Sequence, residues 1–204
     1  MYPITLQQKT TAANGLLELV LYQGKKMLNS PKANYSYGSL QRVFELALEN
    51  HPPQFKVNQR VLILGFGAGS IQKVLLEAHH FTGTVTGVEY DKELTEWVRP
   101  HFEKYFDNVT LEHCDALSFL EKNKNPFDFI FVDLFCDLKC APVCFEGNFY
   151  SLLKQNLLPN GCLYHNTMGS TKQLGFIKQQ YQQQFGNLRS QQFLGSNTVF
   201  YGRA

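Results

Sequence analysis

The glycine-rich stretch "VLILGFGAGS" (61–70) constrains the fold of this chain more than any other segment. A continuous apolar run ends at Gly65, and Gly67 and Gly69 follow at alternate positions. Such a run suits a strand buried on both faces, and the glycines permit a tight turn whose backbone lies close to a ligand. Apolar residues at helical spacing follow the turn. The turn alone leaves open whether the ligand is a dinucleotide, another phosphate or a nucleoside.

The alternation of strands and helices continues along the chain. Five strand-like segments are separated by amphipathic helical patterns: 60–65, 84–90, 108–114, 127–135 and 162–167. Two last strand-like segments, 188–194 and 197–203, have only Gly195 and Ser196 between them, which predicts an antiparallel hairpin. We therefore expect a Rossmann-like open α/β sheet of seven strands, mostly parallel, that closes with this hairpin.

The N-terminal region is predicted to be a small extension of that sheet domain. Residues 16–28 have the pattern of a hairpin that turns near Gly24, and residues 40–48 that of an amphipathic helix stopped by Pro52 and Pro53. We expect residues 1–55 to form this extension and residues 56–204 to form the main domain.

Composition gives no support for several classes of partner. The chain has 204 residues with 19 basic and 17 acidic side chains and no basic run, so nothing favours nucleic-acid binding. No apolar run approaches the ~18 residues that a membrane span requires, and the N-terminus lacks the order of a secretory signal. We expect a cytoplasmic protein that binds neither membrane nor nucleic acid.

The five cysteines are expected to be reduced thiols. Cys136, Cys140 and Cys144 form a C-x3-C-x3-C series, but a structural zinc site needs a second, distant pair of ligands. The prediction is that no metal is bound.

Three acidic residues stand at the ends of successive predicted strands. Glu89 is placed to accept hydrogen bonds from the hydroxyls of a ribose, and Asp115 to accept one from an adenine amino group. Asp133 is expected to face the crevice where strand order reverses. Each acid could instead cap the following helix. This alternative has least support for Asp133, because a long loop follows it. Three carboxylates suit a ligand with hydroxyls, an amino group and a positive charge, and they would repel a pyrophosphate.

The details of the glycine turn narrow the choice further. A dinucleotide fingerprint has a third glycine where Ser70 stands, and no Gly-Lys-Ser/Thr follows as in a P-loop. A nicotinamide-dependent reductase is therefore disfavoured.

With these residues in this order, the chain resembles the spermidine synthase-like branch of the class I S-adenosylmethionine-dependent methyltransferase fold. The resemblance covers nearly the whole chain and is strongest in "FDFIFVDLFCDLKCAPVCFEGNFYSLLKQNLLPNGCL" and "NYSYGSLQRVFELAL". It implies S-adenosylmethionine or its decarboxylated form as the cofactor, a small-molecule acceptor, and a homodimer as an option.

The resemblance also implies roles for individual residues. Those implied to bind the cofactor are Gly65, Phe66, Gly67, Ala68, Gly69, Glu89, Tyr90, Asp115, Ala116 and Asp133. Those implied to be catalytic are Asp133, Asp137 and Tyr37.

One departure from the family pattern decides the expected reaction. Aminopropyltransferases of this family carry an aspartate in the glycine turn that holds the aminopropyl ammonium, and Ala68 occupies its position here. We therefore expect methyl transfer to a small molecule, with aminopropyl transfer from decarboxylated S-adenosylmethionine to a diamine as the alternative. A non-catalytic descendant that binds a nucleoside is a third hypothesis, prompted by the altered loop after Asp133.

Overall fold

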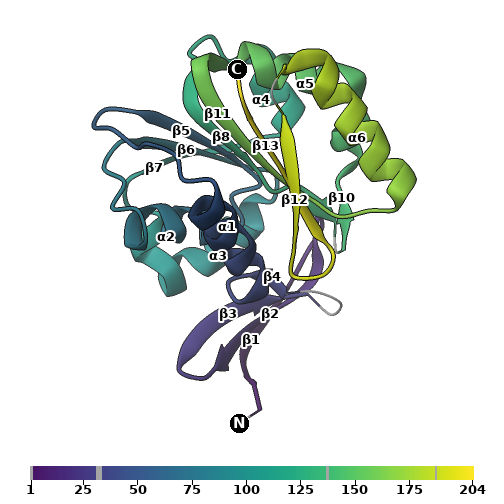
Figure 1. Ribbon diagram of the computed structural model, residues 1–204. Coiled ribbons are helices and arrows are strands. Elements are labelled where there is room, and N and C mark those ends of the chain that lie inside the picture. Colours follow the sequence, from purple (N-terminus) through teal and green to yellow (C-terminus); the bar gives the residue numbers. More distant parts are fainter. Residues whose placement is uncertain (1, 31–33, 137, 187) are drawn as a thin grey trace.

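A seven-stranded sheet forms the centre of the molecule in the computed structural model, which describes residues 2–30, 34–136, 138–186 and 188–204 apart from the side chains of 34, 35, 39 and 40 (Figure 1). The strands lie in the spatial order β12-β13-β11-β8-β5-β6-β7. Their bounds are β5 Arg60–Leu64, β6 Thr84–Glu89, β7 Val109–His113, β8 Phe127–Val132, β11 Leu157–Thr167, β12 Arg189–Phe193 and β13 Asn197–Arg203. Strands β11, β8, β5, β6 and β7 run parallel, and β13 is antiparallel to both β11 and β12. The predicted sheet and its closing hairpin are confirmed.

Helices cover both faces of this sheet (Figure 1). One layer contains α1 Ser39–Asn50, α2 Ser70–Glu77 and α3 Lys92–Phe102, and the other contains α4 Ala116–Lys122, α5 Gly147–Gln155 and α6 Thr171–Gln184. Short 3-10 turns lie at Glu103–Tyr105 and Pro142–Phe145. Each layer buries its own apolar cluster against the sheet, with Phe44 and Phe131 in the first and Tyr150 and Tyr181 in the second. Burial of these two clusters, one on each face of the sheet, stabilises the packing of the helices against the parallel strands.

The order of strands creates a crevice at one end of the sheet. The chain starts at β5, adds β6 and β7 on one side, and then returns to place β8 on the other side of β5. Helices that leave neighbouring strands in opposite directions expose the carboxyl ends of β5 and β8, which is where open α/β sheets bind ligands.

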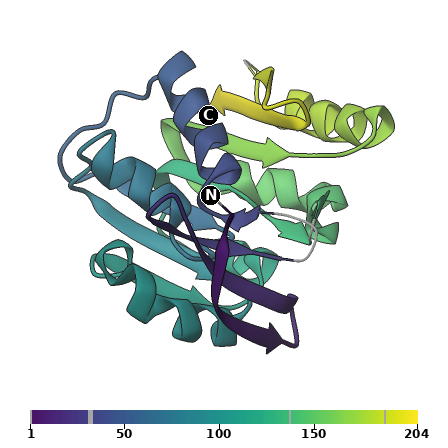
Figure 2. The same ribbon diagram turned by 90° about the horizontal axis from the view of Figure 1, so that it is seen from below.

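The N-terminal region is a four-stranded antiparallel sheet rather than a simple hairpin. Its strands are β1 Ile4–Thr11, β2 Gly15–Tyr22, β3 Lys25–Asn29 and β4 Asn34–Ser36. They lie below the α/β sheet in Figure 1 and in front of it in Figure 2, which is seen from below. The predicted hairpin is confirmed as β2 and β3, which turn through positive φ at Gln23 and Gly24. Strand β1 was not predicted because nearly all its side chains are exposed, so its sequence "ITLQQKTT" lacks apolar alternation.

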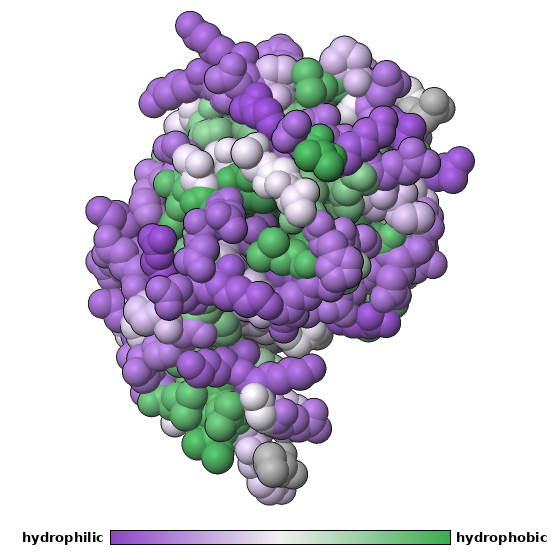
Figure 3. Space-filling view, turned by 90° about the vertical axis from the view of Figure 1, so that its left-hand side faces the viewer, coloured by the Kyte–Doolittle hydropathy of each residue, from purple (hydrophilic) through white to green (hydrophobic). Residues whose placement is uncertain are grey.

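Apolar side chains gather on the outer part of this N-terminal sheet (Figure 3). The large exposed ones are Ile4, Leu6 and Leu16. On its other side this sheet joins the main core, because Leu17, Leu19 and Leu28 of β2 and β3 belong to the buried apolar cluster that contains Phe44 and Phe131. The domain boundary at residue 55 stays a prediction.

Two element boundaries differ from those predicted. Strand β11 starts at Leu157 rather than at residue 162, because Leu157 pairs with Phe127 before the register shifts ahead of Cys162. The predicted strand 127–135 ends at Val132, and the chain then forms a small ladder between β9 Phe135–Cys136 and β10 Lys139–Cys140. Asp133 therefore lies just after the C-terminal end of the central strand β8.

No helix within the described ranges has both the length and the apolar character that crossing a bilayer demands.

Candidate active site

A cavity of about 480 Å³ lies at the carboxyl ends of the parallel strands. Its walls come from the glycine turn after β5, the acidic ends of β6 and β7, and the loop after β8. The turn between β1 and β2 and the turn between β12 and β13 close it from two further sides. Segments from both ends of the chain thus enclose one space above the parallel strands.

The glycine turn approaches the loop after β8 too closely for a side chain. A Cβ on Gly65 would lie 2.3 Å from the main-chain oxygen of Asp133, and Gly65 has a φ of 82°. The amides of Gly65 and Phe66 both donate to the carbonyl of Val88 at 2.9 and 3.0 Å, which holds the turn against β6. Gly65 is therefore required by sterics as well as by backbone conformation.

The five residues of the turn divide into two groups. Gly65, Phe66 and Gly67 line the cavity, and their contact with a ligand stays a prediction. Ala68 is fully buried in the apolar cluster beneath α1. Gly69 has a left-handed backbone conformation and is the N-cap residue of α2. Neither Ala68 nor Gly69 is among the described residues that line the cavity.

Glu89 ends β6 with its side chain buried beside the glycine turn. Its two oxygens accept hydrogen bonds from the amides of Gly67, at 2.9 Å, and Asp91, at 3.0 Å. Burial raises the pKa of Glu89, and these amide donors offset part of that rise. Each carboxylate oxygen retains a further lone pair, so Glu89 can still accept from a ligand in the cavity. The exposed Tyr90 also lines the cavity.

Asp115 combines the two roles that the sequence left open. Its Oδ1 accepts from the amide of Ser118 at 3.0 Å and caps α4. Asp115 and Ala116 also line the cavity. The capping bond fixes the carboxylate in the cavity wall without excluding contact with a ligand.

Asp133 lies at the centre of the crevice. Its amide donates to the carbonyl of Leu64 at 2.9 Å, which extends the β5–β8 ladder by one bond past the sheet. Its Oδ1 accepts from Nδ2 of Asn166 at 3.0 Å. Burial raises the pKa of Asp133 to about 7, against the partial opposing effect of that hydrogen bond. A carboxylate with a pKa near neutrality can both take and return a proton.

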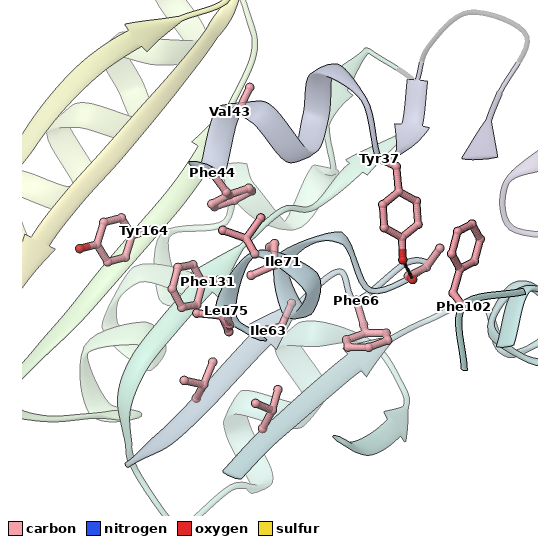
Figure 4. Close-up of a cluster of buried hydrophobic side chains, with 14 of the residues drawn as sticks. Tyr37, Val43, Phe44, Ile63, Phe66, Ile71, Leu75, Phe102, Phe131 and Tyr164 are labelled. Atoms are coloured by element: carbon pink, nitrogen blue, oxygen red, sulfur yellow. Dashed lines mark hydrogen bonds between the residues drawn. The ribbon is translucent and has the colours of Figure 1, made fainter. Parts of the chain in front are cut away.

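Tyr37 lies behind the glycine turn rather than in the cavity. Its hydroxyl donates to the carbonyl of Ala68 at 2.7 Å, and its ring stacks on Phe102 with 4.4 Å between centroids (Figure 4). Its amide donates to Oγ of Ser70 at 2.9 Å. Among the described residues that line the cavity, Tyr37 is absent. The predicted catalytic residue Asp137 lies outside the described residues.

Sequence reasoning missed the residues that join the N-terminal sheet to the site. Asp91 accepts from the hydroxyl of Thr11 and from Nδ2 of Asn14, the latter at 2.7 Å, while it caps α3 through the amide of Leu94. Its own amide donates to Glu89. The capping role of Asp91 could be recognised from sequence, but its contacts with the N-terminal sheet had no sequence signal.

The C-terminal hairpin also supplies residues that the sequence did not indicate. Asn197 and Ser196 line the cavity, with Met168 from the end of β11 beside them. The sequence predicts Asn166 only as part of a strand, and its one signal was a polar residue near the end of an apolar strand. These residues surround the end of the cavity opposite Glu89.

The cysteines are all free thiols. Cys136 lines the cavity, whereas Sγ of Cys140 lies 3.2 Å from the carbonyl of Met168 and Sγ of Cys144 lies 3.7 Å from Nε2 of His165. Within the described part of the chain, no group of three or more His, Cys, Asp or Glu side chains is arranged to hold a metal ion.

The strand order, the glycine turn and the acids at successive strand ends define a class I S-adenosylmethionine-dependent transferase fold. Within that class, the chain belongs to the spermine/spermidine synthase domain family, whose model matches residues 41–193.

Individual relatives agree with this assignment. The chain is 32% identical over 124 residues to spermidine synthase of Dictyostelium discoideum, a match that covers 58% of this chain and 42% of that protein. It therefore spans less than half the length of that relative. A spermidine synthase solved in complex with the transition state analogue AdoDATO has a TM-score of 0.61 at 17% identity, over 98% of this chain and 72% of that one. A probable spermidine synthase from Corynebacterium glutamicum ATCC 13032 has a TM-score of 0.68 at 17% identity, over 97% and 76%. At such identities the two structures show the shared fold.

The expectation of methyl transfer is wrong, because both the family model and the curated relatives are those of spermidine synthases and polyamine aminopropyltransferases. That expectation assumed that the residue at position 68 faces the ligand. The Ala68 side chain instead packs in the core. Its identity is therefore a poor guide to which sulfonium the cavity accepts.

A first prediction concerns the close contact at Gly65. Replacement by alanine in Gly65→Ala should lower the free energy of unfolding by more than about 3 kcal/mol, since the new Cβ would overlap the Asp133 carbonyl and φ is positive. Gly24→Ala is the matched control: φ is 75°, nothing lies within 4 Å, and the expected loss is about 1 kcal/mol. Urea unfolding of both variants gives the comparison, and equal losses would contradict the steric account.

A second prediction follows from the raised pKa of Asp133. Between pH 4 and 7 the unfolded chain releases this proton while the folded chain retains it, so burial of Asp133 costs stability increasingly as pH rises to about 7. Asp133→Asn cannot ionise, so its stability relative to the unmodified chain should increase from pH 5 to pH 8. Urea unfolding at the two pH values measures this difference, and a difference that does not change with pH would be inconsistent with a raised pKa at Asp133.

Proposed function

We propose that this chain transfers the aminopropyl group of decarboxylated S-adenosylmethionine to a small-molecule amine and releases methylthioadenosine. The observation that carries the proposal is Asp133, a half-buried carboxylate with a pKa of about 7 in the cavity of a spermidine synthase family member. A reacting amine must lose a proton, and a base with this pKa is matched to that task.

The lining of the cavity fits the nucleoside part of this substrate. We assign the ribose hydroxyls to Glu89 and the adenine to Asp115 and Ala116, with the aminopropyl arm along Gly65 and Gly67. Three carboxylates at one site favour a ligand that carries donors and a positive sulfonium. The short distance between the glycine turn and β8 supports a ligand that lies flat across the strand ends.

The proposed reaction needs little beyond alignment and one proton acceptor. The amine nitrogen attacks the aminopropyl carbon that is bonded to the sulfonium, the C–S bond breaks, and its electron pair stays on sulfur. The sulfur becomes a neutral thioether, so the leaving group needs no acid. The proton of the attacking amine passes to the carboxylate of Asp133.

Two further assignments complete the proposal. We assign Tyr37 a positioning role, because its hydrogen bond to the Ala68 carbonyl supports the glycine turn from the side away from the cavity. Asp137 remains a proposed second carboxylate for the amine on the strength of the family resemblance alone.

The direct test is incubation of the chain with decarboxylated S-adenosylmethionine and a panel of amines, with products identified by mass spectrometry. Methylthioadenosine and an aminopropylated amine are the expected products. Parallel incubation with S-adenosylmethionine should give no methylated amine. Absence of methylthioadenosine with every amine would end the proposal.

A third prediction concerns the role of Asp133 in this reaction. Asp133→Asn should lower kcat by about 10²- to 10⁴-fold, while binding of methylthioadenosine changes little. The kcat of the unmodified chain should rise with pH through about 7, as Asp133 loses its proton. Asp107→Asn, a change of an exposed aspartate, is the matched control and should leave kcat unchanged. A pH-independent rate in the unmodified chain would exclude Asp133 as the base.

A further inference from the structure

The tip of the β1–β2 hairpin reaches the cavity at the end where Glu89 lies. Ala13 and Asn14, in the turn between the two strands, line the cavity together with Gly67 and Glu89. Ala13 is exposed and Asn14 is half-buried, so this turn forms part of the cavity wall rather than of the core. A segment of the N-terminal sheet thus borders the position that we assign to the ribose.

The hydroxyl of Thr11 organises this tip. It accepts from the amide of Asn14 at 3.1 Å and donates to the Asp91 carboxylate. The same carboxylate oxygen accepts from Nδ2 of Asn14 at 2.7 Å, and the other accepts from the amide of Leu94 at 3.0 Å. Thr11 and Asp91 are both buried. A buried charge needs such donors, so loss of the Thr11 hydroxyl would leave the Asp91 carboxylate with one donor fewer away from water.

Asp91 connects the tip of the hairpin to Glu89. Its amide donates to one Glu89 oxygen at 3.0 Å, and the amide of Gly67 donates to the other at 2.9 Å. Because the Asp91 side chain is held at both oxygens, its backbone amide has little freedom to turn away from Glu89. A path of hydrogen bonds therefore runs from Thr11 through Asp91 to a carboxylate that lines the cavity.

Strand β1 is also held against α3 at a point away from the cavity. Oε1 of Gln7 accepts from Nε1 of Trp97 at 3.2 Å and lies 3.2 Å from Nε2 of His101. Gln7 is exposed, and none of these three residues is among the described residues that line the cavity. The hairpin thus has an anchor that does not involve Thr11, and loss of the Thr11 hydroxyl would affect its tip without detaching the strand.

We infer that Thr11 is a positioning residue for the nucleoside, acting through Asp91 on Glu89. It holds Glu89 in the orientation that accepts the ribose hydroxyls, and it holds the turn at Ala13 and Asn14 against the same end of the cavity. This inference rests on the ribose site of the proposed function. The N-terminal sheet is then a part of the nucleoside site as well as an extension of the fold.

The test is calorimetric titration of methylthioadenosine into the chain and into its Thr11→Val variant. Valine has nearly the shape of threonine but makes no side-chain hydrogen bond, and the expected Kd is about tenfold higher. Thr11→Ser keeps the hydroxyl and should bind to within about twofold of the unmodified chain. Thr10→Val is the matched control on β1, since Thr10 is exposed, and its Kd should not change. An unchanged Kd in Thr11→Val would overturn the inference.

A second ligand separates positioning of Glu89 from a general loss of structure. An analogue of methylthioadenosine without the two ribose hydroxyls lacks the groups that Glu89 is proposed to accept. Its Kd should therefore differ by no more than about twofold between Thr11→Val and the unmodified chain. A loss of structure would weaken both ligands equally, and that result would refute the inference.

Amide hydrogen exchange tests the same coupling in the unmodified chain. If the tip and the nucleoside stabilise each other, saturating methylthioadenosine should slow exchange of the Asn14 amide about tenfold. The amide of Gly24, in the turn between β2 and β3, should exchange at the same rate with and without the ligand. Unchanged exchange at Asn14 would contradict the inference even if Thr11→Val failed to fold.

The outcomes distinguish this inference from the proposed function. With turnover, Thr11→Val should raise the KM for decarboxylated S-adenosylmethionine and leave kcat and the KM of the amine unchanged. A fall in kcat alone would overturn the inference while aminopropyl transfer stands. Without turnover of any amine, aminopropyl transfer fails, and the methylthioadenosine titrations still decide the inference. A chain that binds no methylthioadenosine refutes it.

Discussion

The contact between Gly65 and the main chain of Asp133 is the constraint on which the site depends. Strands β5 and β8 are neighbours in space but far apart in sequence, and their ladder continues through the bond from Asp133 to the Leu64 carbonyl. Only a residue without a side chain fits at position 65, where a Cβ would lie 2.3 Å from the Asp133 oxygen. The reversal of strand order at β5 and β8 forms the crevice, and this close approach places Asp133 in its wall beside the glycine turn.

Burial of that carboxylate has opposite effects on stability and on function. Folding half-buries Asp133 with only the Asn166 amide as its described hydrogen-bond donor, and this loss of solvation raises its pKa to about 7. Burial of the apolar clusters on the two faces of the sheet offsets this loss of stability. Glu89 is treated differently, because two backbone amides accompany it into the interior. One carboxylate is thus suited to hold a ligand and the other to exchange a proton.

Much of this arrangement could be predicted from local sequence. The glycine turn, Glu89 and Asp133 were recognised because strand ends and turns leave short-range patterns. The bonds from Thr11 and Asn14 to Asp91 could not be, since these partners lie about eighty residues apart and no periodicity connects them. The orientation of Ala68 was equally invisible, because sequence does not say which side of a turn a side chain faces. The prediction of methyl transfer was wrong because it assumed that the Ala68 side chain faces the ligand.

The central claim is that Asp133 is a half-buried carboxylate in the cavity that exchanges a proton near neutral pH. A carbon-13 NMR titration of its carboxyl carbon, assigned by the signal that disappears in Asp133→Asn, measures this directly. The account predicts a midpoint near pH 7. A midpoint near the ordinary aspartate value of about 4 would contradict it.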